Sequence, residues 1–197
     1  MARYSFKPGN ILNPLPVVMV SVTDETGFTN VLTVAWTGTI CSDPAMLSIS
    51  VRPERFSYGM LKRSGEFVVN LVTKELAFAC DFCGVKSGRD TDKLKALGLD
   101  TVAVDNVSAK GILQSPVNIG CRIVEEKKLG SHSMFISEVV GVNVEDSYMD
   151  EKGRFDLNSL GLIAYSHGEY IRLGEKVGKF GFSVKKDTAR PKNKKRR

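Results

Sequence analysis

The most restrictive feature of this sequence is a short alternating segment, residues 30–36, which reads NVLTVAW. In an extended strand, successive side chains point to opposite faces. Alternate positions would therefore share a face, with Asn30, Leu32, Val34 and Trp36 on one side and Val31, Thr33 and Ala35 on the other. We interpret this strand as one wall of a cavity that holds a ligand.

A second segment supplies groups that bind anions. Residues 46–52 form another apolar strand, which runs into a turn at Pro53 and then into the start of a helix at Arg55, Phe56 and Ser57. Backbone N–H groups at a helix start, a hydroxyl and guanidinium groups all bind phosphate. Together the two segments indicate a ligand with a flat aromatic part and a phosphate.

The other periodic segments predict a mainly β protein of the α+β class. Residues 17–22 pair with residues 30–36 as a hairpin, and further strands are expected at 67–72, 117–126 and 134–144. Short helices are expected at 56–63, at 74–82 after a Thr73 cap, and at 93–97, while residues 37–44 are a connection. Because strands and helices do not alternate regularly, we predict an antiparallel barrel with peripheral helices.

Length and charge favour one domain. The chain has 197 residues, 42% of them hydrophobic and 25% charged, which suits a single core. We expect an arm at residues 1–16, a domain at 17–184 and a basic, disordered tail at 185–197. The tail carries +7 of the formal charge, which leaves −1 on the rest of the chain. A nucleic-acid partner is therefore not expected, unless it binds the tail.

The location expected from the sequence is the cytoplasm. Pro14 and Pro16 interrupt the first apolar run, so it does not read as a signal peptide, and no apolar run has membrane-spanning length. The four cysteines would then be reduced thiols.

The order of several short motifs resembles the flavin reductase-like family, the FMN-binding split barrels, and within it the flavoredoxin group. The motifs are residues 30–36, Asp43-Pro44, 50–57, 64–70, Cys83-Gly84, Ser87-Gly88, Asp92-Lys93 and 170–174. The resemblance spans residues 14–184. It implies a split β-barrel homodimer that binds FMN without a covalent bond.

The resemblance also implies the site residues and the activity. The FMN contacts would be Asn30, Val31, Leu32, Thr33, Trp36, Ser50, Val51, Arg52, Arg55, Phe56, Ser57, Ser87, Lys93, His132 and Tyr165. The expected activity is that of an oxidoreductase: electrons pass from NAD(P)H, a candidate transient donor, or from a protein donor, through FMN to free flavin or a redox partner. The alternative inside the family is a flavoredoxin-like electron carrier with little NAD(P)H-dependent activity. No catalytic residue is assigned.

Plainer interpretations stay open for individual residues. The single tryptophan, Trp36, could be a core residue, and Thr33 an ordinary strand residue. Arg52, Arg55 and Lys93 could be solvated charges, and His132 at its predicted turn is undecided. A flavin- or haem-binding sensor, or a nucleic-acid binder acting through the tail, are alternatives from other classes.

Cys80 and Cys83 form a CxxC pair, which is typical of thiol redox chemistry or of half a metal site. A metal site needs further ligands, and no second CxxC is present, so we expect buried, inert thiols and no metal. No GxGxxG motif is present either, so we expect no Rossmann nicotinamide domain.

Overall fold

The computed structural model describes residues 1–184, and the predicted tail at 185–197 lies outside the described residues. Its main element is an antiparallel sheet in the order β3-β2-β6-β9-β10-β5-β4. These strands are β2 Val18–Thr23, β3 Thr29–Val34, β4 Thr37–Ser42, β5 Ala45–Val51, β6 Glu66–Leu71, β9 Val117–Leu129 and β10 His132–Val144. The predicted mainly β, antiparallel class is confirmed.

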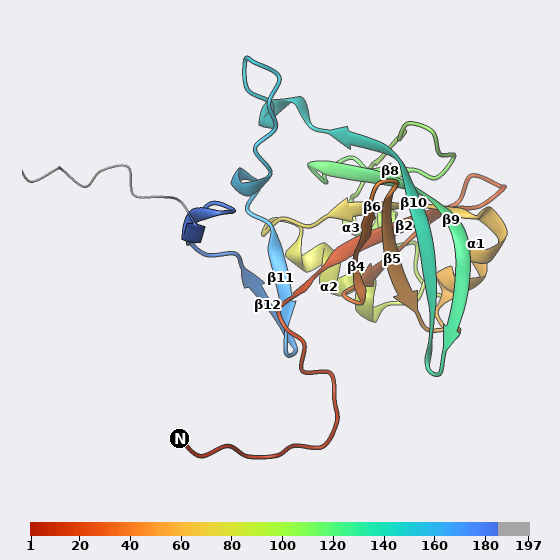
Figure 1. Ribbon diagram of the computed structural model, residues 1–197. Helices are drawn as coiled ribbons and strands as arrows, with labels where there is room; N and C mark the ends of the chain where they lie inside the picture. Colours follow the sequence, from red (N-terminus) through yellow and green to blue (C-terminus); the bar gives the residue numbers. More distant parts are fainter. Residues whose placement is uncertain (185–197) are drawn as a thin grey trace, which may run out of the picture.

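Two small sheets and several short helices surround the main sheet (Figure 1). The small sheets contain β1 Leu15–Pro16, β11 Ile163–Ser166 and β12 Glu169–Arg172, and β7 Thr101–Val102 with β8 Gly111–Ile112. The helices are α1 Phe56–Ser64, α2 Ala77–Val85 and α3 Lys93–Leu97, with 3-10 turns η1 Asp146–Tyr148, η2 Leu157–Ser159 and η3 Phe182–Val184.

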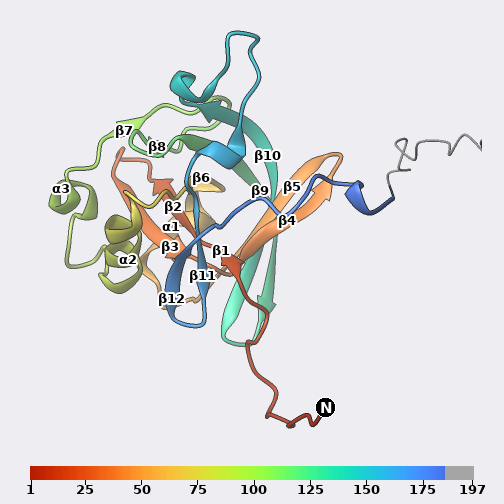
Figure 2. The ribbon, with the colours of Figure 1, turned by 90° about the vertical axis from the view of Figure 1, so that its left-hand side faces the viewer.

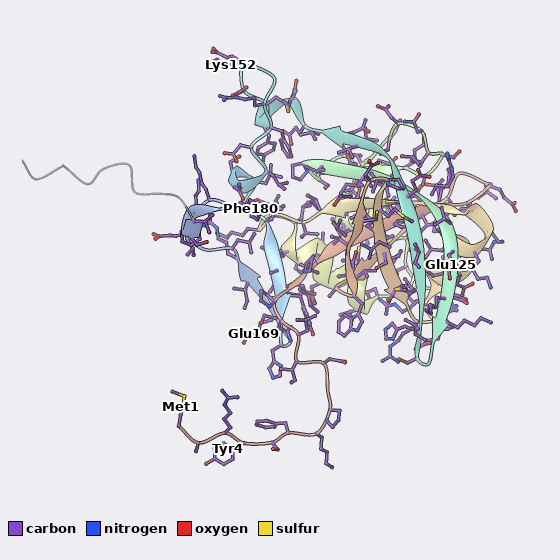
Figure 3. The ribbon with its side chains drawn as sticks, viewed as in Figure 1. Met1, Tyr4, Glu125, Lys152, Glu169 and Phe180 are labelled. Atoms are coloured by element: carbon purple, nitrogen blue, oxygen red, sulfur yellow. The ribbon has the colours of Figure 1, made fainter. Side chains whose placement is uncertain are left out.

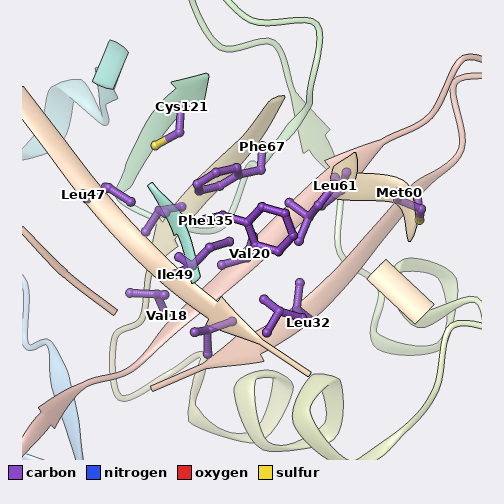
Figure 4. Close-up of a cluster of buried hydrophobic side chains, with 14 residues drawn as sticks. Val18, Val20, Leu32, Leu47, Ile49, Met60, Leu61, Phe67, Cys121 and Phe135 are labelled. Carbon is purple, nitrogen blue, oxygen red and sulfur yellow. The ribbon is translucent and has the colours of Figure 1, made fainter. Parts of the chain in front are cut away.

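The main sheet curls around one apolar core. Side chains from opposite ends of the strand order meet there, including Leu32 of β3, Ile49 of β5 and Phe135 of β10 (Figure 4). Phe67 and Phe135 are almost completely buried at its centre. Because β3 and β4 are the two ends of the hydrogen-bonded order, the curled sheet is a split barrel rather than a closed ring.

A second apolar core lies on the other face of the hairpin of β2 and β3. Met19 and Val31 point away from the first core and pack against Ala79 and Cys80 of α2. The hairpin of β2 and β3 is therefore buried on both faces, and its register pairs Val20 with Leu32. Helix α2 is fixed in this way against the strand that carries the predicted site.

Three local predictions were wrong. Residues 37–44 are mostly the strand β4, an exposed edge strand whose burial does not alternate. Helix α2 begins at Ala77, not at residue 74, because Thr73 is held in an isolated β-bridge to Leu162 and does not cap the helix. His132 begins β10, so the turn between β9 and β10 contains only Gly130 and Ser131.

The N-terminal residues extend away from the compact sheet. Residues 1–10 are exposed and form an extended arm, with Met1 and Tyr4 at its far end (Figure 3). None of the helices within residues 1–184 is long and apolar enough to cross a membrane. The domain boundaries predicted at residues 17 and 184 stay a prediction.

Candidate functional site

Two adjoining cavities lie where β3 and β5 end and α1 begins. We call the first, of about 250 Å³, the aromatic cavity; it is lined by Val17, Leu32, Thr33, Val34, Ala35, Trp36, Ser50, Val51, Arg52, Arg55, Gly84, His132, Tyr165 and Tyr170. We call the second, of about 180 Å³, the basic cavity; it is lined by Asn30, Leu32, Glu54, Arg55, Phe56, Ser57, Val85, Lys86, Ser87, Gly88, Arg89 and Lys93. Leu32 and Arg55 line both, so the two cavities are neighbours.

Aromatic rings from distant parts of the chain form the wall of the aromatic cavity. Trp36 and His132 are stacked, with centroids 6.3 Å apart and an interplanar angle of 3°. Tyr165 lies 6.4 Å from Trp36 and 6.0 Å from Tyr170. Trp36 is 41% exposed, so its interpretation as a core residue is wrong. The rings offer flat apolar surface at the open mouth of a cavity.

Two of these rings are uncharged at neutral pH. Burial and the neighbouring Arg52 lower the pKa of His132, with Glu54 acting in the opposite direction. Burial raises the pKa of Tyr170, and its hydrogen bond to Asp81 adds to the effect. The Tyr170 hydroxyl donates to Asp81 Oδ1 at 3.1 Å, which joins β12 to α2. The positive charge of this cavity comes from Arg52 and Arg55.

The basic cavity lies at the N-terminus of α1. Arg55 is the N-cap residue of this helix, and no side chain caps the helix there. Asn30 Nδ2 donates to Ser57 Oγ at 2.6 Å, and Arg55 Nη2 donates to the Gly84 carbonyl at 2.6 Å. The start of α1 is thereby tied to β3 and α2, and its first N–H groups suit an anion.

The loop after α2 closes the other side of the basic cavity. A Cβ atom on Gly88 would overlap the Asn30 side chain and would come within 2.6 Å of Phe56. Only glycine allows the loop to approach so closely. Next to it, Arg89 Nη1 donates to the Glu54 carbonyl at 3.1 Å, and its guanidinium lies 5.9 Å from the Phe56 ring centre.

Lys93 is buried at the base of the basic cavity, only 4% exposed. Its Nζ donates to the Val31 carbonyl at 2.6 Å and to the Cys83 carbonyl at 2.9 Å. Burial lowers the pKa of Lys93 to about 8, with Cys83 opposing the shift and Arg55 adding to it. Since its hydrogen-bond partners within residues 1–184 are uncharged carbonyls, this ammonium keeps a net positive charge that would favour an anion in the basic cavity.

The charges of the lining residues define what the cavities can bind. The basic cavity combines Arg55, Lys86, Arg89 and Lys93 with a single carboxylate, Glu54. The aromatic cavity contains Arg52 and Arg55 and no carboxylate in its lining. Their donor groups and aromatic walls fit a ligand with a phosphate at one end and a flat ring at the other.

Every predicted site residue except Val31 lines one of the two cavities. The Val31 side chain is buried in the second core, and its carbonyl accepts from Lys93. Thr33 lines the aromatic cavity and also donates to the Cys80 carbonyl. The structure thus brings together residues from most of the segments that carry the resemblance, while Asp43-Pro44 and residues 64–70 line neither cavity.

Sequence reasoning missed several lining residues. These are Val17, Val34, Ala35, Glu54, Gly84, Val85, Lys86, Gly88, Arg89 and Tyr170. Two of these residues could have been found from the motifs that carry the resemblance. Arg89 directly follows Ser87 and Gly88, and Tyr170 begins the motif at 170–174. Hydrophobic periodicity alone would not have found either residue.

The CxxC pair lies on α2, behind the cavities. Cys80 and Cys83 are completely buried and free, as expected. Burial raises the pKa of Cys80 to about 12 and that of Cys83 to about 11, so both stay protonated at neutral pH. Within residues 1–184, no group of three or more His, Cys, Asp or Glu side chains could hold a metal ion.

Comparison with known proteins agrees with this geometry. Residues 12–173 match the family model described as flavin reductase like domain. The flavoredoxin of Desulfovibrio vulgaris (Miyazaki F) is 26% identical, with a TM-score of 0.84 over 93% of this chain and 99% of that chain. A split barrel protein from Shewanella frigidimarina is 20% identical, with a TM-score of 0.75 over 85% and 86% of the two chains. An FMN-binding protein from Thermus thermophilus, solved with bound 1-cyclohex-2-enone, is 25% identical, with a TM-score of 0.76 over 91% and 99%.

Proposed function

Because this chain belongs to the flavin reductase-like family, we propose that its aromatic and basic cavities together hold one FMN molecule without a covalent bond. The observation that carries the proposal is the direct contact of the two cavities at Leu32 and Arg55. A phosphate in the basic cavity would leave the rest of the ligand facing the aromatic rings. Each cavity alone, of about 250 Å³ and about 180 Å³, is smaller than a typical small-molecule site of about 300–1,000 Å³, whereas the two joined fall within that range.

The phosphate would be held by the start of α1 and by the loop after α2. Arg55 and the hydroxyl of Ser57 come from the first element, and Ser87 and Arg89 come from the second. Lys93 would add charge from below without leaving its carbonyl partners. These groups include three cations, so they fit a phosphate dianion better than a neutral hydroxyl.

The ring would lie in the aromatic cavity, against Trp36, with Ser50 and Arg52 along one side and His132 and Tyr165 along the other. When bound, FMN would supply the redox chemistry by taking up a hydride or electrons and passing them on. The chain would orient the ring and place the Arg52 cation beside it. Because Trp36 is partly exposed, a reaction partner can reach this end of the site.

The protein would act as an oxidoreductase that takes electrons from NAD(P)H or a protein donor. Free flavin or a redox partner would receive them. The similarity to a flavoredoxin supports the alternative, an electron carrier with little NAD(P)H-dependent activity. A steady-state assay with NADH, NADPH and free FMN separates the two, because only a flavin reductase turns over free FMN with a nicotinamide donor.

The proposal includes a homodimer in the cytoplasm. Exposed apolar side chains on the arm and on the edge strand, such as Leu12 and Ile40, support a second copy as the partner. Four free cysteines support a reducing compartment. Light scattering of the purified protein tests the dimer.

The visible absorption spectrum of protein purified without added cofactor tests the central proposal. Bands near about 375 nm and about 450 nm are expected for bound oxidised flavin. Any colourless fraction would be titrated with FMN and, as a control without phosphate, with riboflavin. A colourless protein that binds neither compound would contradict the proposed function.

A further inference from the structure

The amino group of Lys93 is held in a fixed geometry at the base of the basic cavity. The side chain comes from α3 and is 4% exposed. Its Nζ donates to the Val31 carbonyl of β3 at 2.6 Å and to the Cys83 carbonyl of α2 at 2.9 Å. Figure 2 shows α2 and α3 on the same side of the main sheet, next to β3. Three elements of the fold therefore fix the position of this nitrogen.

The bonds of this nitrogen leave one of its four tetrahedral directions open. The two carbonyls take two directions and Cε takes a third, and no acceptor among residues 1–184 takes the fourth. In the ammonium form the fourth direction carries the third N–H group. In the neutral amine, which has only two N–H groups, it carries the lone pair. Because Lys93 lines the basic cavity, a molecule bound there can meet either form.

Burial makes the neutral, nucleophilic form of Lys93 available at ordinary pH. It lowers the pKa to about 8, with Cys83 opposing the shift and Arg55 adding to it. At pH 8 about half of this side chain is therefore neutral, against less than about 1% of an ordinary lysine with a pKa of about 10.4. Such a lysine is a good nucleophile toward carbonyl compounds. The other charged residues that line the cavity are Glu54, Lys86 and Arg89.

The rest of the basic cavity selects the compounds that reach this nitrogen. The first N–H groups of α1 are not capped by a side chain, and Arg55, Lys86 and Arg89 add positive charge. These groups favour a compound that carries a phosphate. The volume of about 180 Å³ suits a phosphate on a short carbon chain.

We propose that Lys93 is a site of reversible covalent modification, where its Nζ forms an imine with a small phosphorylated aldehyde. The phosphate lies at the start of α1, and the aldehyde carbon lies in the open direction of Nζ. The lone pair of the nitrogen forms a bond to this carbon. The aldehyde oxygen leaves as water with two protons from the amine, so nothing is oxidised or reduced. Once protonated, the imine keeps one N–H for a backbone carbonyl and a positive charge for the phosphate.

This modification goes beyond the proposed function, because it needs the basic cavity but not the flavin. If the basic cavity also holds the FMN phosphate, the two phosphates compete for one place. Only the flavin-free protein would then be modified, and phosphorylated aldehydes would control how much protein can take up FMN.

Glyceraldehyde 3-phosphate, with glyceraldehyde as the control without a phosphate, tests the proposal. Full-length, flavin-free protein is incubated with each aldehyde at about pH 8, the imine is reduced with borohydride, and the labelled lysine is identified by mass spectrometry of peptides. We expect label on Lys93, at least about tenfold more from the phosphorylated aldehyde, and suppression of the label by inorganic phosphate. Equal labelling by the two aldehydes would overturn the proposal. So would label on Lys86 instead, which lines the same cavity but is exposed.

Lys93→Arg is the sharpest variant, because it keeps a cation for the phosphate but has no nucleophilic amine. It should lose the adduct, whereas Lys86→Arg should keep it. An equal yield of adduct in Lys93→Arg protein would contradict the proposal. Mapping the label in the unchanged protein needs no variant, so the test stands even if Lys93→Arg does not fold.

The pH profile of labelling separates Lys93 from an ordinary lysine. Labelling of Lys93 should rise up to about pH 8 and then level off, whereas that of exposed Lys95 on the same helix should rise further. Parallel profiles would overturn the proposal. FMN is titrated into the same flavin-free protein. Normal FMN binding without a Lys93 adduct would overturn this inference alone, and a Lys93 adduct without FMN binding would overturn only the proposed function.

Discussion

The basic cavity and the aromatic cavity adjoin each other but are built in opposite ways. In the basic cavity, buried hydrogen bonds fix the polar groups, as between Asn30 and Ser57 and between Lys93 and two carbonyls. In the aromatic cavity, the wall consists of ring contacts at 6.0–6.4 Å, and Trp36 is partly exposed. One region is organised by short polar contacts, the other by apolar surface.

This difference indicates that the two parts of the proposed site have different roles in binding. Preformed donors hold a charged group strongly because no side chain needs to be ordered when the ligand binds. An open aromatic wall contributes less affinity but leaves the ligand accessible to a second molecule. We therefore expect changes in the basic cavity to alter affinity, and changes in the aromatic cavity to alter the properties of the bound ring.

The largest effect is expected from the double substitution Arg55→Ala with Ser57→Ala. It removes a cation and a hydroxyl from the basic cavity, and each charged hydrogen bond contributes about 1.5–3 kcal/mol. FMN affinity should fall on the order of 100-fold or more, while riboflavin, which has no phosphate, should lose far less. Titrations of both ligands measure this, with a thermal melt as the control because Ser57 is buried. Equal losses of affinity for FMN and riboflavin would contradict the placement of the phosphate in the basic cavity.

The second prediction concerns pH and the buried Lys93, whose pKa is lowered to about 8. The ammonium is charged below this pKa and neutral above it, so its attraction for a phosphate is complete below pH 8 and is lost as the pH rises. FMN affinity should fall above pH 8, by up to about tenfold per pH unit, and riboflavin affinity should not change.

Titrations on both sides of pH 8 measure this dependence, and Lys93→Met should remove it. The same pH dependence in Lys93→Met would show that another group titrates. A flat profile for the unchanged protein would mean that Lys93 does not act on the phosphate.

The smallest change in affinity is expected from Trp36→Leu in the aromatic cavity. FMN affinity should fall by less than about tenfold, because the phosphate contacts remain. The absorption spectrum of the bound flavin should shift, because a neighbouring ring is lost. Phe78→Leu, an exposed aromatic residue of α2 that lines neither cavity, is the control. An unchanged absorption spectrum of the flavin bound to folded Trp36→Leu protein would show that Trp36 does not contact the flavin ring.

Much of the fold could be predicted because local patterns and tertiary packing agree. The hairpin of β2 and β3 was visible from its apolar runs and turn residues, and α3 from its Asp92 cap and Gly98 stop. The edge strand β4 was missed because an exposed edge strand has no alternation of burial. The start of α2 was misplaced because Thr73 is held in a bridge to Leu162, far along the chain.

The site residues were predictable to a similar degree. Arg55 and Ser57 were visible because a helix start after a strand is a local feature. Val31 was predicted to contact the ligand, yet its side chain is buried, because β3 packs on both of its faces. Tyr170 and Arg89 lie in short motifs that the resemblance includes or adjoins, but their contacts with Asp81 and with the Glu54 carbonyl join distant segments, which periodicity does not reveal.

The sequence by itself determined the elements that carry the chemistry: an apolar strand that covers residues 30–34, a cationic helix start at Arg55, and a glycine-bearing loop at Gly88. These depend on neighbouring residues, whose spacing is fixed by the geometry of strands and helices. Only the tertiary structure decided that Trp36, His132 and Tyr165 share one wall. Such contacts depend on the curl of the sheet and on side-chain packing between distant segments, and neither is encoded in any local pattern.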